Sequence, residues 1–327
     1  MARSDLLLSL VRSATAGDDQ LFTRTVEAIV AEERAKQHHV LADQLAANLR
    51  TPAPRPPKGR PTTDTGGLQF VAEVSPRRKL GDLILPEVVR TVANEVIEEH
   101  HRVDLLRSYN LEPRHRILLV GPPGNGKTSL AEALAEALFV PLFVVRYDAL
   151  IGSYLGETAS RLRQLFDDVR MQQCVLFFDE FDVVGKERGD AQETGEIKRV
   201  VSQLLLQIDA LPSHVVVVTA TNHPELLDRA VWRRFQVRLL LPAPERAQVE
   251  EWFRRFVVRF GQPLGHSPRA LAERLAGASF SEVEEFAADV QRRFVLMQPQ
   301  ANVRAIVGQR LQQWEARVSA VGAAENG

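Results

Sequence analysis

The stretch from Gly121 to Thr128, with the sequence GPPGNGKT, constrains the fold more than any other part of the chain. Its spacing is G-x-x-x-x-G-K-T, and it follows the apolar run 117–120, which we expect to form a short buried strand. The next residues, SLAEALAEALF, have the composition and period of an amphipathic helix. Strand, glycine-rich loop and helix in this order predict a phosphate-binding loop. The alternative is an ordinary glycine-rich turn between a strand and a helix.

In the phosphate-binding interpretation, the loop and the first residues of the helix hold a nucleotide. Glycines let successive backbone N–H groups curl around the phosphates, and the helix N-terminus adds partial positive charge. Lys127 would reach the β- and γ-phosphates, and the Thr128 hydroxyl would bind Mg²⁺, so ATP and Mg²⁺ are the predicted cofactors. The predicted nucleotide-binding residues are Gly121, Pro122, Pro123, Gly124, Asn125, Gly126, Lys127, Thr128 and Ser129.

Two further motifs follow apolar runs that read as strands. The run VLFF ends in Asp179 and Glu180; Asp179 suits a second oxygen ligand for Mg²⁺, and Glu180 suits a base that polarises the attacking water. Asn222, at the end of VVVVTATN, could hold that water against the γ-phosphate. Acidic residues and asparagine are also common where strands end in turns, and each motif alone would be open to that explanation.

Two other stretches contain unusual side chains. Arg233 and Arg234, in LDRAVWRRF, could stabilise the charge that develops during phosphoryl transfer, or could be an ordinary surface pair. Tyr154 and Leu155 lie in GSYLGET, where glycines flank an aromatic residue. An exposed tyrosine is unusual in a loop of this kind, so Tyr154 either has a function there or packs against its own domain.

Strand and helix patterns alternate from residue 68 to residue 244. We expect strands near 117–120, 142–146, 174–178, 214–222 and 236–241, and helices near 86–109, 157–171 and 196–210. This alternation predicts an α/β fold, a parallel sheet with helices on both faces and its ligand site at the carboxyl ends of the strands. After Pro244 only helical patterns follow, near 245–260, 268–276, 281–297 and 300–319, which predicts a small all-helical lid.

These patterns divide the chain into five parts. Residues 1–50 read as a helical module for docking a partner or substrate, and the proline-rich stretch 51–67 reads as a linker. The predicted α/β nucleotide-binding domain spans 68–244, the lid 245–320 and a tail 321–327.

Composition excludes several classes of protein. The formal net charge of −1 gives no reason to expect a nucleic-acid or membrane surface. The single cysteine, Cys174, excludes an intramolecular disulfide and reads as a buried, unreactive thiol. No apolar run is long enough to cross a bilayer and the N-terminus is unlike a secretory signal, so we expect a cytoplasmic protein without membrane contact.

Together, GPPGNGKT, the strand ending in Asp179 and Glu180, ATN at 220–222 and LDRAVWRRF resemble the AAA ATPases over about residues 75–298. The resemblance implies a ring, usually a hexamer, with ATP bound between subunits. It implies that Arg233 and Arg234 act as arginine fingers on a neighbour's nucleotide. Asn222 would then be the first sensor, and Tyr154 with Leu155 would form a pore loop that grips a polypeptide; the segment 186–195 falls where the family keeps a second pore loop.

The chain departs from the commonest family pattern in two places. Where many relatives have R-P-G-R-F, it has only Arg233, Arg234 and Phe235, which leaves open which arginine points at the phosphate. In the lid the usual Phe-Ser-Gly-Ala-Asp is replaced by the sequence 280–284, FSEVE, so contacts to ribose and adenine are not transferred from the family.

The layout, with helices and a proline-rich linker before the ATPase, resembles compact bacterial AAA ATPases encoded beside a subtilisin-like serine protease, some implicated in phage defence or plasmid incompatibility. The chain itself has neither H-E-x-x-H nor G-x-S-x-G. We therefore expect an ATP-hydrolysing motor that remodels, unfolds or threads a protein and delivers it to a separate protease. The alternatives are a nucleic-acid-remodelling ATPase and a nucleotide-gated assembly switch with little turnover.

Overall fold

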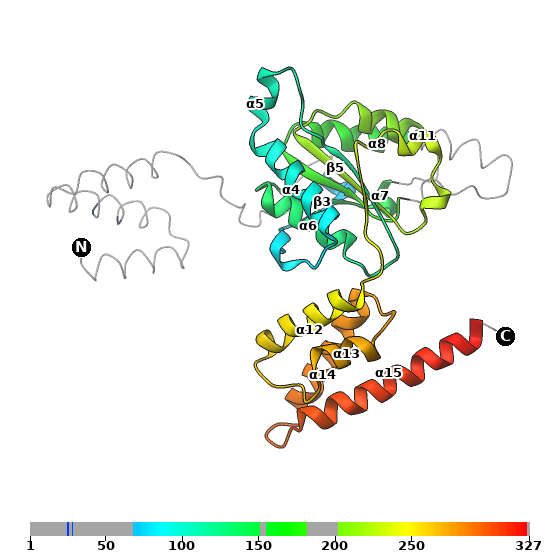
Figure 1. Ribbon diagram of the computed structural model, residues 1–327. Helices are drawn as coiled ribbons and strands as arrows, with labels where there is room; N and C mark the ends of the chain where they lie inside the picture. The colour runs from blue at the N-terminus through cyan, green and yellow to red at the C-terminus, as the bar shows by residue number, and fades with distance from the viewer. Residues whose placement is uncertain (1–24, 26–27, 29–67, 151–154, 182–201, 326–327) are drawn as a thin grey trace. The chain divides into compact units, whose positions relative to one another are not determined.

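A computed structural model describes Thr25, Ala28 and residues 68–150, 155–181 and 202–325. The chain divides into two units, Met1–Asp64 and Thr65–Gly327. The predicted N-terminal module 1–50 and linker 51–67 lie outside the described residues, apart from Thr25 and Ala28, both helical. The second unit contains an α/β part and a helical part (Figure 1).

The α/β part is built on a six-stranded sheet with the order β1-β3-β4-β5-β2-β6. Five strands are parallel, as the alternating pattern predicts, and only β1 runs antiparallel to its neighbour β3. This edge strand was not predicted, because only the first of its four residues is buried and its sequence lacks the apolar run of the others. The strands are β1 Val71–Val74, β2 Arg116–Val120, β3 Leu142–Val145, β4 Cys174–Phe178, β5 Val215–Thr221 and β6 Val237–Leu240.

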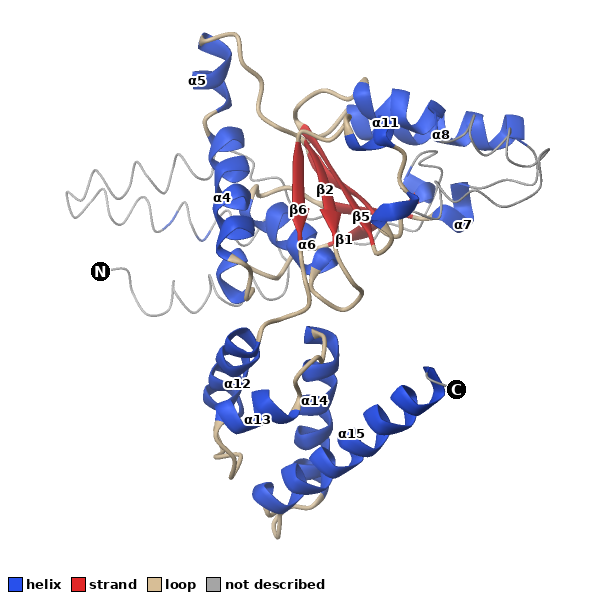
Figure 2. Cartoon of the chain, turned by 45° about the vertical axis from the view of Figure 1, so that its right-hand side comes forward, coloured by secondary structure: helices blue, strands red, loops and turns tan. Residues whose placement is uncertain are grey.

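Helices cover both faces of this sheet, and Figure 2 shows α4 and α6 on one side and α8 and α11 on the other. β4 and β5 are buried at every position, so alternate residues feed two separate apolar clusters. One cluster packs β-strand residues against α8 and the helical segment 202–209, and the other packs them against α4 and α6. The helices here are α4 Glu87–His101, α5 Val103–Ser108, α6 Lys127–Ala137, α7 Tyr147–Leu150, α8 Leu155–Arg170 and α11 Arg229–Trp232, with 3₁₀ turns η1 Leu68–Phe70, η2 Leu80–Asp82 and η3 Pro224–Leu226.

The predicted single helix 86–109 is two helices, and that prediction was wrong. Arg102 leaves helical geometry with φ −112° and ψ 31°, ending α4 and beginning α5. Because helix-forming residues lie on both sides of Arg102, the sequence alone does not show that one helix ends there and another begins.

The last part is all-helical, as predicted, and has its own apolar core. Its helices are α12 Arg246–Phe260, α13 Pro268–Arg274, α14 Phe280–Leu296 and α15 Val303–Glu325. Local signals set the ends: Gly261 closes α12 with a left-handed residue, and the Ser267 and Ser279 side chains cap α13 and α14. α15 continues past the predicted end near 319 and across the predicted start of the tail at 321. None of the described helices is long and apolar enough to cross a membrane.

Candidate functional site

The glycine-rich loop leaves β2 through a position that only glycine can occupy. The Gly121 N–H donates to the Thr221 carbonyl on neighbouring β5, at 3.3 Å. A Cβ on Gly121 would lie 2.0 Å from the backbone oxygen of Leu241, which is closer than any real contact. The first glycine of the motif therefore lets the loop pass directly against the chain that follows β6.

The loop then leads into the start of α6. Gly124 and Gly126 have φ of 75° and 86°, a region that side chains disfavour. Gly126 is the N-cap residue of α6, and no side chain caps this helix end. The first N–H groups of a helix lack partners within it, so this end is suited to hold anionic phosphate oxygens.

Lys127 is the first residue of α6 and is only 6% exposed. Its ammonium donates to the carbonyls of Gly121, at 2.7 Å, and Pro122, at 2.9 Å. These bonds hold the charge inside the loop that precedes it. A γ-phosphate bound there would meet a cation that is already positioned.

The end of β4 meets the next residue of α6. Thr128 Oγ1 donates to Asp179 Oδ2 at 3.3 Å, so a hydroxyl and a carboxylate from distant parts of the sequence are adjacent, as predicted for two ligands of one Mg²⁺. The second carboxylate oxygen, Oδ1, accepts the Glu180 N–H at 2.9 Å. Glu180 itself has a φ of 48°, unusual for a side-chain-bearing residue, and is exposed toward the same cavity.

Asn222 follows β5 and faces the cavity with an unsatisfied group. Its Oδ1 is buried and has no hydrogen-bond partner among the described residues. Leaving such an acceptor unpaired costs about 1–3 kcal/mol, which a bound water or ligand hydroxyl would recover. The residues present therefore fit a nucleotide, its Mg²⁺ and a water molecule.

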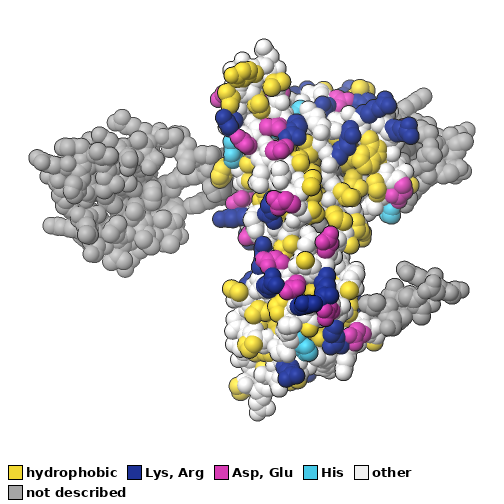
Figure 3. Space-filling model, in the orientation of Figure 1, with side chains coloured by type: hydrophobic (Ala, Val, Ile, Leu, Met, Phe, Trp, Pro, Cys, Tyr) yellow, Lys and Arg dark blue, Asp and Glu magenta, His cyan; other side chains and the backbone are white. Residues whose placement is uncertain are grey.

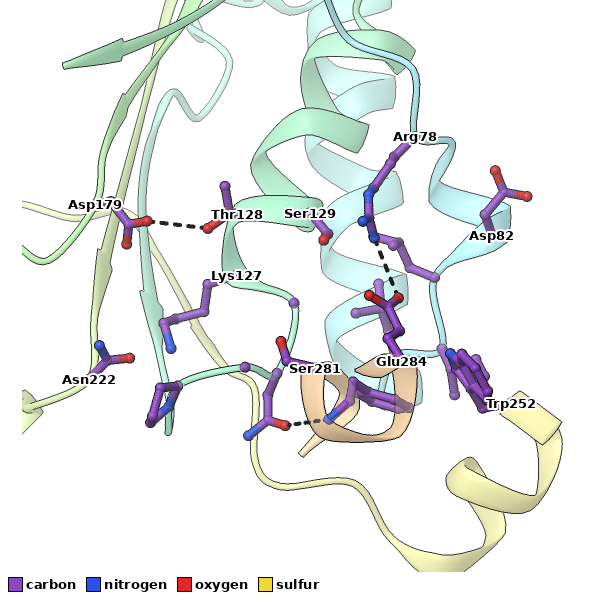
Figure 4. A pocket seen from close by; sticks show the side chains of 18 of the residues that line it. Arg78, Asp82, Lys127, Thr128, Ser129, Asp179, Asn222, Trp252, Ser281 and Glu284 are labelled. Carbon is purple, nitrogen blue, oxygen red and sulfur yellow. Dashed lines mark hydrogen bonds and ion pairs between the residues drawn. The ribbon is translucent and has the colours of Figure 1, made fainter. Parts of the chain in front are cut away.

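Residues 123–129, Asp179, Glu180 and Asn222 line one cavity of about 350 Å³, and Figure 4 shows Lys127, Thr128, Asp179 and Asn222 in it. Gly121 and Pro122, also predicted to bind the nucleotide, do not line it. The other residues that line this cavity lie far apart in the chain and follow no recognisable spacing. They are Arg78, Asp82, Leu83, Ile84 and Leu85 before α4 and Trp252, Phe280, Ser281 and Glu284 in the helical part.

Arg233 and Arg234 do not line this cavity, and their surroundings differ. Arg234 forms an ion pair with Asp209, whose other oxygen accepts from Arg116 Nη1 at 2.6 Å. Arg233 is exposed, and the described residues offer it no ion pair. The two arginines that the sequence left equivalent are thus distinct in the fold.

The predicted pore residues cannot be placed. Tyr154 and the segment 186–195 lie outside the described residues. Leu155 is the first residue of α8, but its side chain is not described.

Comparison with known proteins identifies the class to which this fold and site belong. The family model for "ATPase family associated with various cellular activities (AAA)" matches residues 117–243. The uncharacterized AAA family ATPase y4kL of Sinorhizobium fredii is 37% identical over 292 residues, covering 87% of this chain and 87% of that protein. The chain therefore belongs to the AAA family and is an ATPase.

Two other matches cover the ATPase part. The ATP-dependent zinc metalloprotease FtsH 1 of Salinibacter ruber is 36% identical over 174 residues, 51% of this chain but only 25% of that protein. The crystal structure of the FIGL-1 AAA domain matches with a TM-score of 0.59 at 21% identity, covering 79% of this chain and 92% of that one. The structural match supports the fold alone.

Proposed function

We propose that this chain is a Mg²⁺-ATP-driven ring motor that remodels, unfolds or threads a protein substrate. The observation that carries the proposal is the composition of the cavity at the phosphate loop. It gathers Lys127, the Thr128–Asp179 pair, Glu180 and the unsatisfied Asn222, while leaving both arginines outside. The cavity has the phosphate loop, the two Mg²⁺ ligands and the water-binding groups of a hydrolysis site, and an interface between subunits would add an arginine finger to them.

Each residue of the cavity takes one role in this proposal. Residues 121–129 hold the phosphates through backbone N–H groups, with Lys127 opposite the β- and γ-phosphates. Thr128 and Asp179 hold Mg²⁺, which supplies charge neutralisation when bound. Glu180 polarises the attacking water, and Asn222 orients this water by accepting a hydrogen bond from it.

The missing cation would come from the next subunit of a ring, which we propose to be a hexamer. Arg234 is held within its own subunit by Asp209, whereas Arg233 is exposed and therefore available to a neighbour. We assign Arg233 as the finger that reaches the neighbour's phosphates and Arg234 as the residue that orients the turn carrying it. Arg233 then acts in trans, and Arg234 acts on it within the same subunit.

The proposed substrate is a polypeptide gripped by Tyr154 and Leu155 and recruited by the N-terminal module. The name of the matched relative FtsH 1 joins ATP dependence to proteolysis, which supports a protein substrate. The sequence contains neither of the two protease motifs, so we propose that proteolysis comes from a partner. The layout of the chain suggests a subtilisin-like serine protease as this partner. We propose that the two proteins act together in antiviral defence. We place the protein in the cytoplasm.

Surface charge disfavours the nucleic-acid alternative. On the face shown in Figure 3, Lys and Arg side chains are interspersed with Asp and Glu side chains, with no continuous basic band. Several arginines on the described helices also pair with acidic residues one turn away, as in Arg254–Glu250 and Arg255–Glu251 on α12. A surface that binds the phosphate backbone of a nucleic acid carries Lys and Arg side chains clustered on one face and free to contact phosphates.

The test uses mixed rings. Arg233→Ala subunits keep an intact cavity but lack the finger, whereas Glu180→Gln subunits keep the finger but lack the residue that polarises the water. Each variant alone should therefore release little phosphate. When the two variants are mixed, an Arg233→Ala site beside a Glu180→Gln subunit should regain turnover, because the neighbour supplies the finger. A mixture as inactive as the separate variants would exclude the trans arrangement.

A further inference from the structure

The nucleoside end of the cavity has its own chemistry, separate from that of the phosphate loop. The loop fixes where phosphates lie, so the sugar and base extend toward the wall formed by Leu83, Ile84, Leu85 and Trp252. Between that wall and Ser129 on α6, Figure 4 shows two charged side chains, Arg78 and Glu284, pointing toward each other.

Glu284 is held at a fixed position relative to the phosphate loop. The Ser281 N–H donates to the Gly124 carbonyl at 2.9 Å, and the Phe280 N–H donates to Asn125 Oδ1 at 3.4 Å. These bonds attach the first turn of α14 to the loop itself. Glu284 lies three residues after Ser281, on the same face of that helix, so its carboxylate projects along the cavity.

Arg78 is positioned from the opposite side. The backbone N–H groups of Arg77 and Arg78 both donate to Glu132 Oε1 on α6, at 2.9 and 3.2 Å. The Arg78 guanidinium then lies 3.7 Å from Glu132 and 3.9 Å from Glu284. Arg78 thus bridges the helix of the phosphate loop and the helical part, and orients the Glu284 carboxylate without burying it.

An ionised carboxylate accepts hydrogen bonds and donates none, and adenosine donates from its ribose hydroxyls and from the amino group of the base. The ribose is the part of a nucleotide between phosphates and base, which matches a carboxylate that lies between the phosphate loop and the apolar wall. We propose that Glu284 accepts a hydrogen bond from a ribose hydroxyl and so selects ribonucleotides over deoxyribonucleotides, with Arg78 as the positioning residue. This inference rests on the proposed function of the cavity. It assigns to the sequence FSEVE a role that the family pattern does not supply.

The experiment is isothermal titration calorimetry with ADP, 2′-deoxy-ADP and 3′-deoxy-ADP, so neither hydrolysis nor substrate processing enters. Wild-type protein should bind ADP about tenfold more tightly than at least one deoxy analogue, as expected for loss of a hydrogen bond to a charged group. Glu284→Ala should bring that ratio close to one by weakening ADP alone. Glu284→Gln, which keeps an acceptor, should retain part of the ratio, and Arg78→Ala should lower it without abolishing it.

Glu285→Ala is the matched control, because Glu285 is exposed on the same helix and does not line the cavity. It should retain the full wild-type ratio. The inference is overturned if wild-type protein binds the three nucleotides equally, or if Glu284→Ala weakens all three to the same extent. The motor proposal could fail in mixed rings with this ratio intact, so the two failures are distinguishable.

Discussion

Asp209 pairs with two arginines, one from the β2 strand and one from the turn that precedes β6. Its Oδ1 accepts from Arg116 Nη1 at 2.6 Å, and its Oδ2 pairs with Arg234. The side chains of Arg116, Asp209 and Arg234 are 21%, 31% and 29% exposed. Replacing Asp209 by Asn removes the negative charge and leaves two partly buried guanidinium groups facing each other.

The expected cost follows from burial and charge. Breaking a fully buried ion pair by removing one partner costs about 3–5 kcal/mol, whereas an exposed pair is worth about 0–1 kcal/mol. With two charge-assisted bonds at roughly a quarter of full exposure, Asp209→Asn should lower the free energy of unfolding by about 2 kcal/mol. For a folded unit of this size that corresponds to a fall in Tm of about 4–8 °C.

The assay is thermal and urea denaturation of the full chain, with Asp167→Asn as the matched control. Asp167 also pairs with an arginine, Arg170 at 3.8 Å, but its side chain is 72% exposed, so its substitution should change stability by less than about 0.5 kcal/mol. A double-mutant cycle between Asp209→Ala and Arg234→Ala should give a coupling energy of about 1–2 kcal/mol.

The same measurements separate the two arginines. Arg234→Ala should destabilise the chain, though less than Asp209→Ala because the Arg116–Asp209 pair remains. Arg233→Ala should leave its stability unchanged and reduce only the turnover of assembled subunits. If Asp209→Asn is no less stable than Asp167→Asn, or if Arg233→Ala and Arg234→Ala destabilise equally, the reasoning that divides their roles is refuted.

Three further predictions follow from the site and the core. Gly121→Ala should cost about 3 kcal/mol because its Cβ would meet the Leu241 carbonyl, whereas Gly81→Ala, with nothing within 4 Å, should be nearly neutral; equal urea midpoints would contradict this. Burial raises the pKa of the Cys174 thiol to about 12, so at pH 8 iodoacetamide should label the unfolded chain but not the folded one, as mass spectrometry would show. EDTA should stop phosphate release and added Mg²⁺ should restore it; full turnover in EDTA would remove the metal from the proposal.

The parts of the fold that the sequence predicts well are those with a single strong physical cause. Buried strands such as Cys174–Phe178 are continuous apolar runs bounded by polar residues, so their limits are readable to within a residue or two. The phosphate loop is predictable for a similar reason, because binding one ligand requires all of its residues at a fixed spacing. Cys174 is fully buried, as its position at the start of such a run indicated.

What the sequence does not predict depends on contacts between distant segments. β1 exposes three of its four residues and is defined by its antiparallel pairing with β3 rather than by its own pattern. The nucleoside end of the cavity combines Arg78, Trp252 and Glu284, which have no common spacing to detect. The surroundings of Arg233 and Arg234 differ because Asp209, at the end of another helix, pairs with only one of them.

The position of the arginine pair argues that a subunit does not use it on its own nucleotide. The Gln236 N–H, two residues after Arg234, donates to the Arg116 carbonyl at 3.0 Å, so this turn lies at the amino end of β2. The phosphate loop leaves the carboxyl end of the same strand, and five residues of parallel strand span about 17 Å. Arg234, which is tied through Asp209 to Arg116, cannot cover that distance, and Arg233 does not line the cavity. β2 therefore separates the phosphate loop from the arginine pair at its other end, and we expect any contact of Arg233 with phosphate to involve the nucleotide of a second copy of the chain.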